Sequence, residues 1–489
     1  MVQTTDVLIV GTGFSGLGMG IQLRKAGRED FIIVEKADDV GGTWRDNTYP
    51  GCECDIPSHM YSFSYELNPE WSRHFSGNQE IWDYLRDVTA KHRLHEKIQY
   101  GVRVTGAEWD EDRHRWTVHT ESGETYDARA VVSGVGALHI PNIPDLPGTQ
   151  TYEGQRFHSA QWNHDVDLRG KRVAVIGTGA SAVQFIPNIV DRAEHVTVFQ
   201  RTPPWVLPKN DKAIPEWKRG LFRSVPQAQR AYRNALYWVL ESRAVGFNGQ
   251  INILKFAEKI VERFIRKAVD DPAVQQKLIP DYRMGCKRIL QSNTYYKTFN
   301  RADVSLVDAG GAEITPNGVV DNTGHEHDVD VIIYGTGFHV VDSLEYLDIT
   351  GRDGKNLGKV FESDGVETYL GINVTGFPNL FFMLGPNTGL GHNSVVFMIE
   401  QQAKYIVRFL DELDRRGATA ADVRPAAQRT FNDSIQRKLT KGIWTQGGCT
   451  SWYLDSQGKN RTIWPGFTFM YWWETRSVDT TSYDWVTAA

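Results

Sequence analysis

Two glycine-rich segments of nearly the same design begin about a third of the chain apart. The first reads Gly11-Thr12-Gly13-Phe14-Ser15-Gly16, and the second reads Gly177-Thr178-Gly179-Ala180-Ser181-Ala182. A segment of this kind binds the diphosphate of a dinucleotide, because its glycines allow a tight turn and a close approach of phosphate to the backbone. The helix that follows then presents its N-terminus to the negative charge. Each segment therefore predicts a dinucleotide site.

The residues at the end of the following strand distinguish the two sites. Glu35 occupies this position after the first segment, and a carboxylate there accepts hydrogen bonds from ribose hydroxyls, which suits FAD or NAD. After the second segment the position is Gln200, followed by Arg201 and Thr202. A guanidinium and a hydroxyl there suit the 2′-phosphate of NADP. The residues thus predict FAD or NAD at the first site and NADP at the second.

The elements that must position these segments are visible in the hydrophobic pattern. The first segment lies between apolar runs at 6–10 and 31–35, with a helix-prone stretch up to Ala26, and the second lies between runs at 172–176 and 195–200. A single Gly-x-Gly-x-x-Gly is common, but two copies in full strand-turn-helix-strand context are not. The pattern predicts an α/β fold with two Rossmann-like dinucleotide-binding domains.

The rest of the chain suggests how these domains are arranged. Runs at 102–109, 116–120 and 126–133 alternate like a three-stranded meander, and 131–136 returns toward the first nucleotide site. Prolines at 141, 144 and 147 indicate a linker into the second domain, and the pattern over 215–269 predicts helices. The runs at 304–307 and 330–338 look like closing strands of the second domain, and residues 399–413 are expected to form a late helix. We expect an FAD domain from 1–146 and 342–489, and an NADP domain over 147–341 with a helical insertion at about 211–283.

Composition excludes several classes of protein. The net charge of −6 gives no basic field for nucleic acid, and no apolar run approaches the roughly 18 residues of a membrane span. No secretory signal precedes the first strand, so we expect a cytoplasmic protein. The four cysteines are too few and too scattered for a disulfide framework or a zinc site, and the histidines show no metal-ligand spacing. The tryptophans that crowd the C-terminal region suggest a large interface between domains.

A protein that holds FAD and NADP could be a dithiol reductase, a simple reductase or a monooxygenase. A dithiol reductase needs a cysteine pair that faces the flavin, but the segment after the first unit reads Gly-Gly-Thr-Trp-Arg-Asp-Asn-Thr-Tyr-Pro-Gly-Cys-Glu-Cys-Asp over 41–55. Cys52 and Cys54 do not have thioredoxin-like spacing. The segment resembles the first-domain motif of the Baeyer-Villiger monooxygenases, Gly-Gly-x-Trp, four residues, aromatic-Pro-Gly, three residues, Asp, and it matches every fixed position through Asp55.

Three further stretches are similar to this family. Residues 152–163 contain the Gly154, His158 and Trp162 of its inter-domain motif, although Tyr152 and Asn163 depart from the usual Phe and Pro or Asp. Residues 281–301 resemble the segment that supplies the active-site Lys-Arg pair, here Lys287 and Arg288. Residues 450–453 resemble the loop whose tryptophan, here Trp452, closes over the bound nicotinamide nucleotide.

The resemblance implies a role for each of these residues. The family converts ketones to esters or lactones through a C4a-peroxyflavin, and both this anion and its adduct with the ketone need a fixed cation. Arg288 is the candidate because arginine stays protonated, and Asp55 would orient it. Lys287 would hold the phosphate or ribose side of NADP, and Trp452 would pack over the nucleotide.

The full set of expected site residues follows from the two segments and the resemblance. Arg288 and Asp55 are the expected catalytic residues. The expected cofactor-binding residues are Gly11, Gly13, Phe14, Ser15, Gly16, Glu35, Lys36, Thr43, Trp44, Asp55 and Val104 at the first site, and Gly177, Thr178, Gly179, Ala180, Ser181, Gln184, Arg201, Thr202, Lys287 and Trp452 at the second. No metal is expected.

We expect an FAD- and NADPH-dependent monooxygenase that acts on a small ketone, with O2 as co-substrate, and that also oxygenates sulfides. Oxidation of sulfur or nitrogen as the main role is one alternative, and a flavin reductase or NADPH oxidase is another. The protein is expected to be a monomer or a small homo-oligomer. The segment at 384–392 is expected to pass near the flavin.

Overall fold

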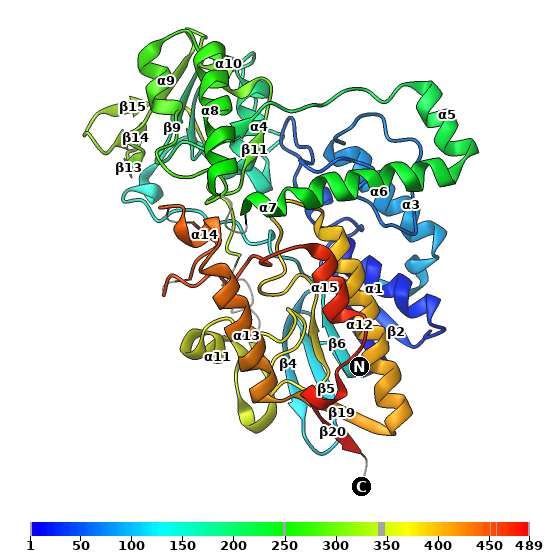
Figure 1. Ribbon diagram of the computed structural model, residues 1–489. Coiled ribbons are helices and arrows are strands. Elements are labelled where there is room, and N and C mark those ends of the chain that lie inside the picture. Colours follow the sequence, from blue (N-terminus) through cyan, green and yellow to red (C-terminus); the bar gives the residue numbers. More distant parts are fainter. Residues whose placement is uncertain (1, 248–250, 341–347, 450, 456, 488–489) are drawn as a thin grey trace.

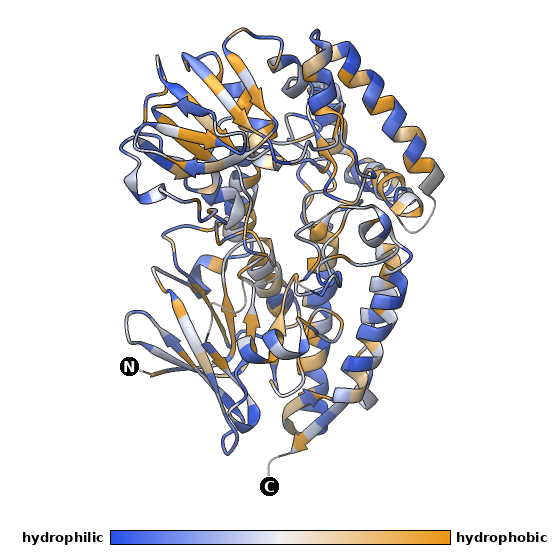
Figure 2. Ribbon diagram, turned by 90° about the vertical axis from the view of Figure 1, so that its left-hand side faces the viewer, coloured by the Kyte–Doolittle hydropathy of each residue, from blue (hydrophilic) through white to orange (hydrophobic). Residues whose placement is uncertain are grey.

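The computed structural model describes residues 2–247, 251–340, 348–449, 451–455 and 457–487 (Figure 1). Two β-sheets, each with its own helices, form the lower and upper parts of the molecule in Figure 1. Figure 2 shows the same two parts from the side, with hydrophobic segments in the strands of each sheet. Each glycine-rich segment follows a strand of a different sheet, as the sequence pattern predicts.

The lower sheet is built around the first glycine-rich segment. Its order is β17-β4-β5-β6-β1-β2-β3, with β18 paired to β6. The strands are β1 (Val2–Val10), β2 (Phe31–Glu35), β3 (Ile98–Tyr100), β4 (Val104–Asp110), β5 (Arg115–Thr120), β6 (Thr125–Ser133), β17 (Asp348–Thr350) and β18 (Leu380–Phe382). Strand β1 pairs in parallel with β2 and β6, whereas β4, β5 and β6 are antiparallel. The expected meander is therefore confirmed.

The upper sheet is parallel and carries the second segment. Its order is β12-β9-β8-β16-β7, from β7 (Gln155–His158), β8 (Arg172–Ile176), β9 (His195–Phe199), β12 (Val304–Val307) and β16 (Val331–Tyr334). A small antiparallel sheet of β13 (Gly311–Ile314), β14 (Gly318–Asp321) and β15 (Glu326–Asp328) lies beside it. The strand expected near 330–338 is thus β16, and it pairs within this upper sheet.

Helices cover both sheets. The helices that begin within the two glycine-rich segments, called the fingerprint helices below, are α1 (Phe14–Lys25) and α4 (Ala180–Ile189). The long helix α12 (Val395–Arg416) packs against α1. The expected helical stretch is confirmed as α5 (Glu216–Ser224), α6 (Pro226–Ser242), α7 (Ala244–Phe247) and α8 (Ile251–Ala268), followed by α9 (Pro272–Leu278). In Figure 1 the chain leaves the upper part to reach α5 at the right, and α6 runs back toward α7, passing close to α3 (Asn78–Lys91) of the lower part in this view. The Gln229 side chain of α6 donates to the Asn68 carbonyl at 2.6 Å.

The remaining elements complete the two parts. They are α2 (Thr43–Asp46), α10 (Tyr295–Thr298), α11 (Leu357–Asp364), α13 (Pro425–Leu439), α14 (Ile443–Gln446), α15 (Thr468–Thr475), β10 (Val206–Leu207), β11 (Leu290–Gln291), β19 (Ala418–Val423) and β20 (Tyr483–Thr487). Residues of the lower sheet come from 2–133 and 348–382, and those of the upper sheet come from 155–334. The exact domain boundaries stay a prediction.

Close backbone packing explains the glycines of the two segments. Gly11 has φ +102°, and a Cβ at Gly16 would lie 1.8 Å from the Gly11 carbonyl oxygen. The second segment has Ala182 where the first has Gly16, and the Ala182 Cβ leaves no room for a side chain on the facing Gly335, where an added Cβ would lie 2.9 Å from it. Close packing of the helix against the turn and the neighbouring strand thus limits the size of the residue at the third glycine position, which is Gly16 in the first segment and Ala182 in the second.

The C-terminal tryptophans only partly form the expected interface. Trp444 is buried and stacks on Phe247 of α7 with ring centroids 5.7 Å apart, so it does join the C-terminal region to the helical insertion. Trp472 and Trp473 are exposed on α15. For these two residues the interface prediction is wrong, because short-helix geometry turns them to the outer face while Tyr471 takes the buried one.

Candidate functional site

One large cavity lies between the two sheets. Its volume is about 1790 Å³, which exceeds the roughly 300–1,000 Å³ of a pocket for one small ligand. Every expected site residue except Gly16 lines it. Gly16 instead packs against Gly11, as its place in the turn requires. The cavity therefore brings together residues that lie hundreds of positions apart in sequence.

The N-termini of both fingerprint helices open onto this cavity. Gly13 precedes α1 and Gly179 precedes α4, and neither helix has a side-chain cap or an acidic residue in its first turn. By contrast, Ser394 caps α12 with its side chain. An uncapped helix N-terminus leaves backbone N–H groups that a phosphate satisfies. Both helix starts are thus suited to a diphosphate.

Glu35 is held at the edge of the first helix start. Its Oε2 accepts from the Thr12 backbone N–H at 3.0 Å and hydroxyl at 2.6 Å, and its Oε1 lies 3.2 Å from an Arg45 nitrogen. Glu35 is 4% exposed. The Ala37 N–H also donates to Oε1 at 3.0 Å. Four donors thus orient a carboxylate that has about four acceptor positions, and a ribose hydroxyl would share an oxygen with one of these donors or replace it.

A positive region lies beside the second helix start. Arg201 is exposed and lines the cavity together with Thr202 and Lys287. Burial lowers the pKa of Lys287, and the nearby positive charge of Arg201 lowers it further. Gln200, at the carboxylate position of this unit, is buried and donates to the Lys277 carbonyl at 2.7 Å. Two cations and a hydroxyl therefore converge where a 2′-phosphate would need them.

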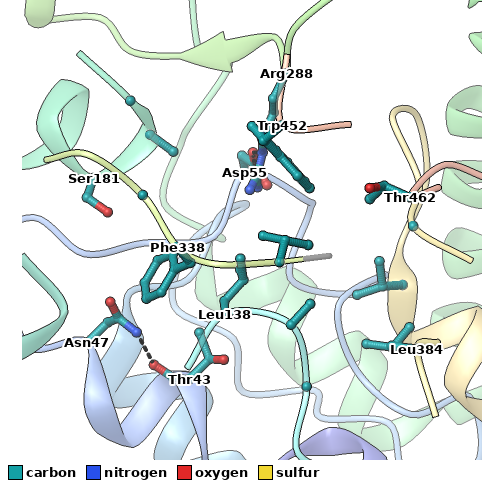
Figure 3. Close-up of a pocket in the computed structure, with 18 of the residues that line it drawn as sticks. Thr43, Asn47, Asp55, Leu138, Ser181, Arg288, Phe338, Leu384, Trp452 and Thr462 are labelled. Carbon is teal, nitrogen blue, oxygen red and sulfur yellow. Dashed lines mark hydrogen bonds and ion pairs between the residues drawn. The ribbon is translucent and has the colours of Figure 1, made fainter. Parts of the chain in front are cut away.

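Arg288 and Asp55 form an ion pair at the cavity wall (Figure 3). Arg288 Nη2 lies 2.6 Å and Nε lies 3.1 Å from Asp55 Oδ2. The carboxylate raises the pKa of Arg288 above its ordinary value, so the guanidinium stays charged. The Arg288 side chain is 43% exposed, and it lines the cavity. Within the described residues, no hydrogen bond engages Nη1, which leaves this donor for a ligand.

The motif that ends at Asp55 is held by the second fingerprint helix. Gln184 of α4 accepts from the Tyr49 hydroxyl at 2.8 Å and donates to the Glu53 carbonyl at 2.9 Å. Lys209, with a side chain only 3% exposed, donates to the Cys54 carbonyl at 3.0 Å and pairs with Glu53 at 2.7 Å. The Gln184 amide, expected at the cofactor, is thus engaged with the 41–55 motif. Sequence reasoning missed Lys209.

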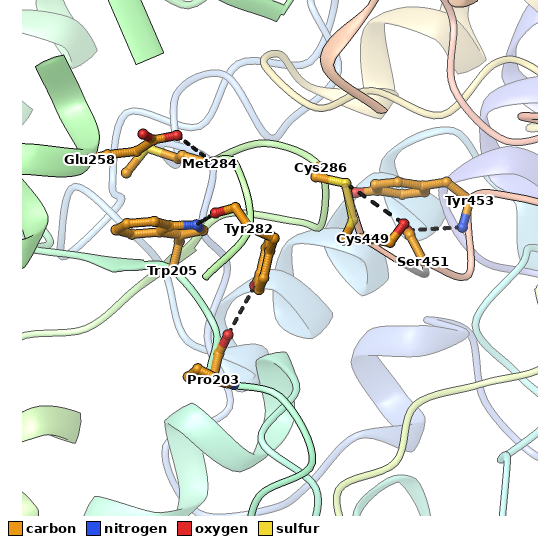
Figure 4. Close-up of a disulfide and its surroundings, with 9 residues drawn as sticks. All are labelled: Pro203, Trp205, Glu258, Tyr282, Met284, Cys286, Cys449, Ser451 and Tyr453. Atoms are coloured by element: carbon orange, nitrogen blue, oxygen red, sulfur yellow. Dashed lines mark hydrogen bonds between the residues drawn. A yellow bond between two sulfur atoms is a disulfide. The ribbon is translucent and has the colours of Figure 1, made fainter. Parts of the chain in front are cut away.

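The segment that carries Arg288 is anchored on the other side by the upper part (Figure 4). The Trp205 indole donates to the Tyr282 carbonyl at 2.9 Å, and Glu258 of α8 accepts from the Met284 N–H at 2.9 Å. After Arg288, β11 pairs in parallel with β10. These contacts fix the backbone on both sides of Lys287 and Arg288. Lys287 lies near Arg201, whereas Arg288 pairs with Asp55.

Trp452 lines the same cavity as Arg288 and Asp55, and the three side chains overlap in the view of Figure 3. Trp452 is 45% exposed, and its ring centroid is 4.3 Å from that of the buried Tyr453. Burial raises the pKa of Tyr453 to about 12, with Arg288 and Asp55 near enough to act on it with opposite signs. Tyr453 belongs to a stretch that the sequence singled out, but its place beneath Trp452 became visible only in the fold.

The cysteines require a correction. Cys286 and Cys449 form a disulfide, whereas no disulfide framework was expected from the sequence. Their separation of 163 residues hid the fact that the fold brings their Cα atoms to 6.2 Å. Cys52 and Cys54 are free and buried, and burial raises the pKa of the Cys52 thiol to about 12 and raises that of Cys54 also. Thiols of this kind are unreactive, as expected for packing residues.

The last part of the chain supplies an apolar wall. The segment expected near the flavin does line the cavity, with Leu384 and Leu390 among its residues. Phe247 of α7 and Leu254 of α8 add further apolar surface from the helical insertion. Sequence reasoning assigned no site role to these insertion residues, because helical spacing alone does not say which face meets a cavity.

The described residues contain neither a metal-binding cluster nor a helix that could span a membrane. No group of three or more His, Cys, Asp or Glu side chains there is placed to hold a metal ion. None of the described helices combines the length and the apolar character that crossing a membrane requires.

Comparison with known proteins agrees with this geometry. A family profile described as pyridine nucleotide-disulphide oxidoreductase matches residues 8–234. The chain is 48% identical to a Baeyer-Villiger monooxygenase of Pseudomonas aeruginosa, over 98% of this chain and 90% of that protein. It is 45% identical to a Baeyer-Villiger monooxygenase of Streptomyces coelicolor, over 98% of this chain and 92% of that protein.

Solved structures with the same fold extend the comparison. The crystal structure of OTEMO in complex with FAD and NADP has a TM-score of 0.88 at 28% identity and covers 99% of both chains. The closed structure of cyclohexanone monooxygenase has a TM-score of 0.89 at 27% identity and covers 100% of both chains. The fold class and the family expected from the sequence are confirmed: this chain belongs to the Baeyer-Villiger monooxygenases.

Proposed function

We propose that this enzyme uses FAD and NADPH to insert one atom of O2 beside a ketone carbonyl, which gives an ester or a lactone. The observation that carries the proposal is the Arg288–Asp55 pair. It lies on the wall of the cavity onto which the N-termini of both fingerprint helices open. The relatives named Baeyer-Villiger monooxygenase and the neighbour crystallised with FAD and NADP support it.

The residues fit both cofactors. The uncapped start of α1 and the oriented Glu35 carboxylate suit the diphosphate and a ribose of FAD. The uncapped start of α4, with Arg201, Thr202 and Lys287 nearby, suits the diphosphate and 2′-phosphate of NADPH. Bound flavin supplies the chemistry that reduces O2 with electrons from NADPH.

The other cofactor contacts are proposed on the same basis. Residues at the first site are Gly11, Gly13, Phe14, Ser15, Lys36, Thr43, Trp44 and Val104, and those at the second site are Gly177, Thr178, Gly179, Ala180, Ser181 and Gln184. All line the cavity, and Gly16 contributes by packing. We place the FAD domain at 1–146 and 342–489, and the NADP domain at 147–341.

Arg288 provides the fixed positive charge that this reaction needs. Negative charge develops on the ketone oxygen when the carbonyl is attacked, and a preorganised donor to it lowers the barrier. Arginine does not give up its proton at working pH, so it stabilises the anion without quenching it. Asp55 holds the guanidinium through Nε and Nη2, and Nη1 is left to face the ligand.

Trp452 and Tyr453 reduce access of water to this position. Trp452 lines the cavity with almost half of its surface accessible, and Tyr453 is buried behind it. Packing of the indole over the nicotinamide nucleotide would cover the accessible surface. Exclusion of water strengthens the interaction of Arg288 with the developing anion.

The test is a panel of cyclic and linear ketones with purified holoenzyme, NADPH and ¹⁸O-labelled O2. We expect a product that carries one labelled oxygen and a matching consumption of NADPH. A parallel panel of sulfides measures the second expected activity. Consumption of NADPH with release of an equal amount of hydrogen peroxide, and no oxygenated product from either panel, would identify an NADPH oxidase instead.

A further inference from the structure

The Cys286–Cys449 disulfide joins the two segments that carry the proposed nucleotide contacts. Cys286 immediately precedes Lys287 and Arg288, and Cys449 lies three residues before Trp452. Figure 4 shows the two sulfur atoms between the Tyr282–Met284 stretch and the Ser451–Tyr453 stretch. The bond thus links the segment of Lys287 to the segment of Trp452, and these two residues both line the cavity.

The two segments also touch without the covalent bond. The Arg283 N–H donates to the Gly447 carbonyl at 3.1 Å, and a Cβ at Gly447 would lie 2.4 Å from the Cys286 Cβ. The two cysteines therefore approach each other because the backbones pack closely. Reduced thiols at these positions would remain neighbours and could close again.

The two sulfur atoms differ in access. Cys286 is 0% exposed, whereas Cys449 is partly exposed at the surface of the segment. A small oxidant or a thiol reductant therefore reaches Cys449 first, and Cys286 is placed to complete or release the bond.

We propose that Cys286 and Cys449 are a peroxide-responsive pair whose disulfide holds the Trp452 segment against the Lys287 segment and slows release of the nicotinamide nucleotide. The inference rests on the proposed nucleotide site but goes beyond the proposed reaction. In the reduced enzyme, one backbone hydrogen bond and packing hold the segments. In the oxidised enzyme, a covalent bond does so.

The oxidation balances with hydrogen peroxide, which an NADPH-consuming flavoenzyme releases when reduction of O2 is not followed by oxygen transfer. The Cys449 thiolate attacks one peroxide oxygen, the O–O bond breaks, and the leaving hydroxide takes a proton to become water. The resulting sulfenic acid is attacked by the Cys286 thiol, which forms the S–S bond and releases a second water. The two sulfur atoms together lose two electrons, and the peroxide gains two.

The first measurement is a count of thiols in the denatured holoenzyme after treatment with dithiothreitol or with hydrogen peroxide. We expect four thiols after reduction and two after oxidation, since the chain has four cysteines and Cys52 and Cys54 are buried. Peptide mapping should show one cross-linked peptide pair that contains Cys286 and Cys449. Four thiols after peroxide treatment, or a different pairing, overturn the proposal.

The second measurement is the rate of NADP⁺ dissociation from each form. We expect dissociation from the oxidised wild type to be slower by about threefold or more, because opening of a covering segment commonly limits release. Cys449→Ser and Cys286→Ser should both show the fast rate, with no response to either treatment. Equal rates in the two wild-type forms refute the role. Neither readout needs a ketone product, so failure of the proposed oxygenation would be seen separately.

Discussion

Arg288 and Asp55 are 233 positions apart in sequence, yet two nitrogens of the Arg288 guanidinium donate to one oxygen of Asp55, at 2.6 Å and 3.1 Å. Asp55 belongs to a segment held by α4 and Lys209, and Arg288 belongs to a segment held by Trp205 and Glu258. The pair therefore forms only when both parts of the fold are in place.

Replacement of Arg288 by alanine should slow oxygenation strongly and spare the earlier steps. We expect Arg288→Ala to retain FAD and to be reduced by NADPH, but to form ester at a rate lower by about a hundredfold or more, because a preorganised donor to a developing anion is lost. The measurements are the rate of flavin bleaching under anaerobic conditions and the rate of product formation in air.

The matched variants of this pair are Arg288→Lys and Asp55→Ala. Lysine keeps the charge but lacks the planar fork, so it should recover only part of the activity. The loss from Asp55→Ala should not add to that from Arg288→Ala, because the two residues act as one unit. An Arg288→Ala enzyme that forms ester at the parent rate would rule out this role.

Arg201 should set the preference for the phosphorylated nucleotide. A charge-assisted hydrogen bond contributes about 1.5–3 kcal/mol, so kcat/KM for NADPH should exceed that for NADH by roughly one to two powers of ten. Arg201→Ala should remove most of this difference and leave the NADH value nearly unchanged. Equal kcat/KM values for the two nucleotides in the parent enzyme contradict the assignment.

Trp452 should control how well oxygen transfer is coupled to NADPH use. Trp452→Ala removes an indole that lines the same cavity as Arg288, so water should gain access and more hydrogen peroxide should form per NADPH. Trp472→Ala, at an exposed tryptophan on α15, is the control. If peroxide yield and FAD content are the same in both variants and in the parent, Trp452 does not cover the site.

Lys287 should make nucleotide binding sensitive to alkaline pH. Its folded-state pKa lies below the ordinary 10.5 because of burial and the charge of Arg201, so it loses its charge at a lower pH than a free lysine. The KM for NADPH should therefore rise as the pH increases through this lowered pKa, while at lower pH the cation is fully present. Lys287→Arg keeps its charge and should flatten the rise. An identical pH profile in both enzymes excludes Lys287 from the phosphate site.

The sequence by itself determined the fold class, the two dinucleotide sites and the family. Gly11, Gly16 and Gly177 reveal their roles locally, because the backbone turn they permit is set by neighbouring residues. The difference between Glu35 and Arg201 is also local, since each lies at or just after the end of the strand that follows its own glycine segment and helix. Periodicity likewise marked the meander and the helical insertion.

Only the tertiary structure decided which distant side chains meet. The engagement of Gln184 with Tyr49 and Glu53, the burial of Tyr453 behind Trp452, and the outward position of Trp472 depend on how the two parts pack. The Cys286–Cys449 bond spans 163 residues, and spacing along the chain carries no information about such a contact. Local patterns specify turns and strands through short-range sterics, whereas these contacts arise from long-range packing that no sequence window contains.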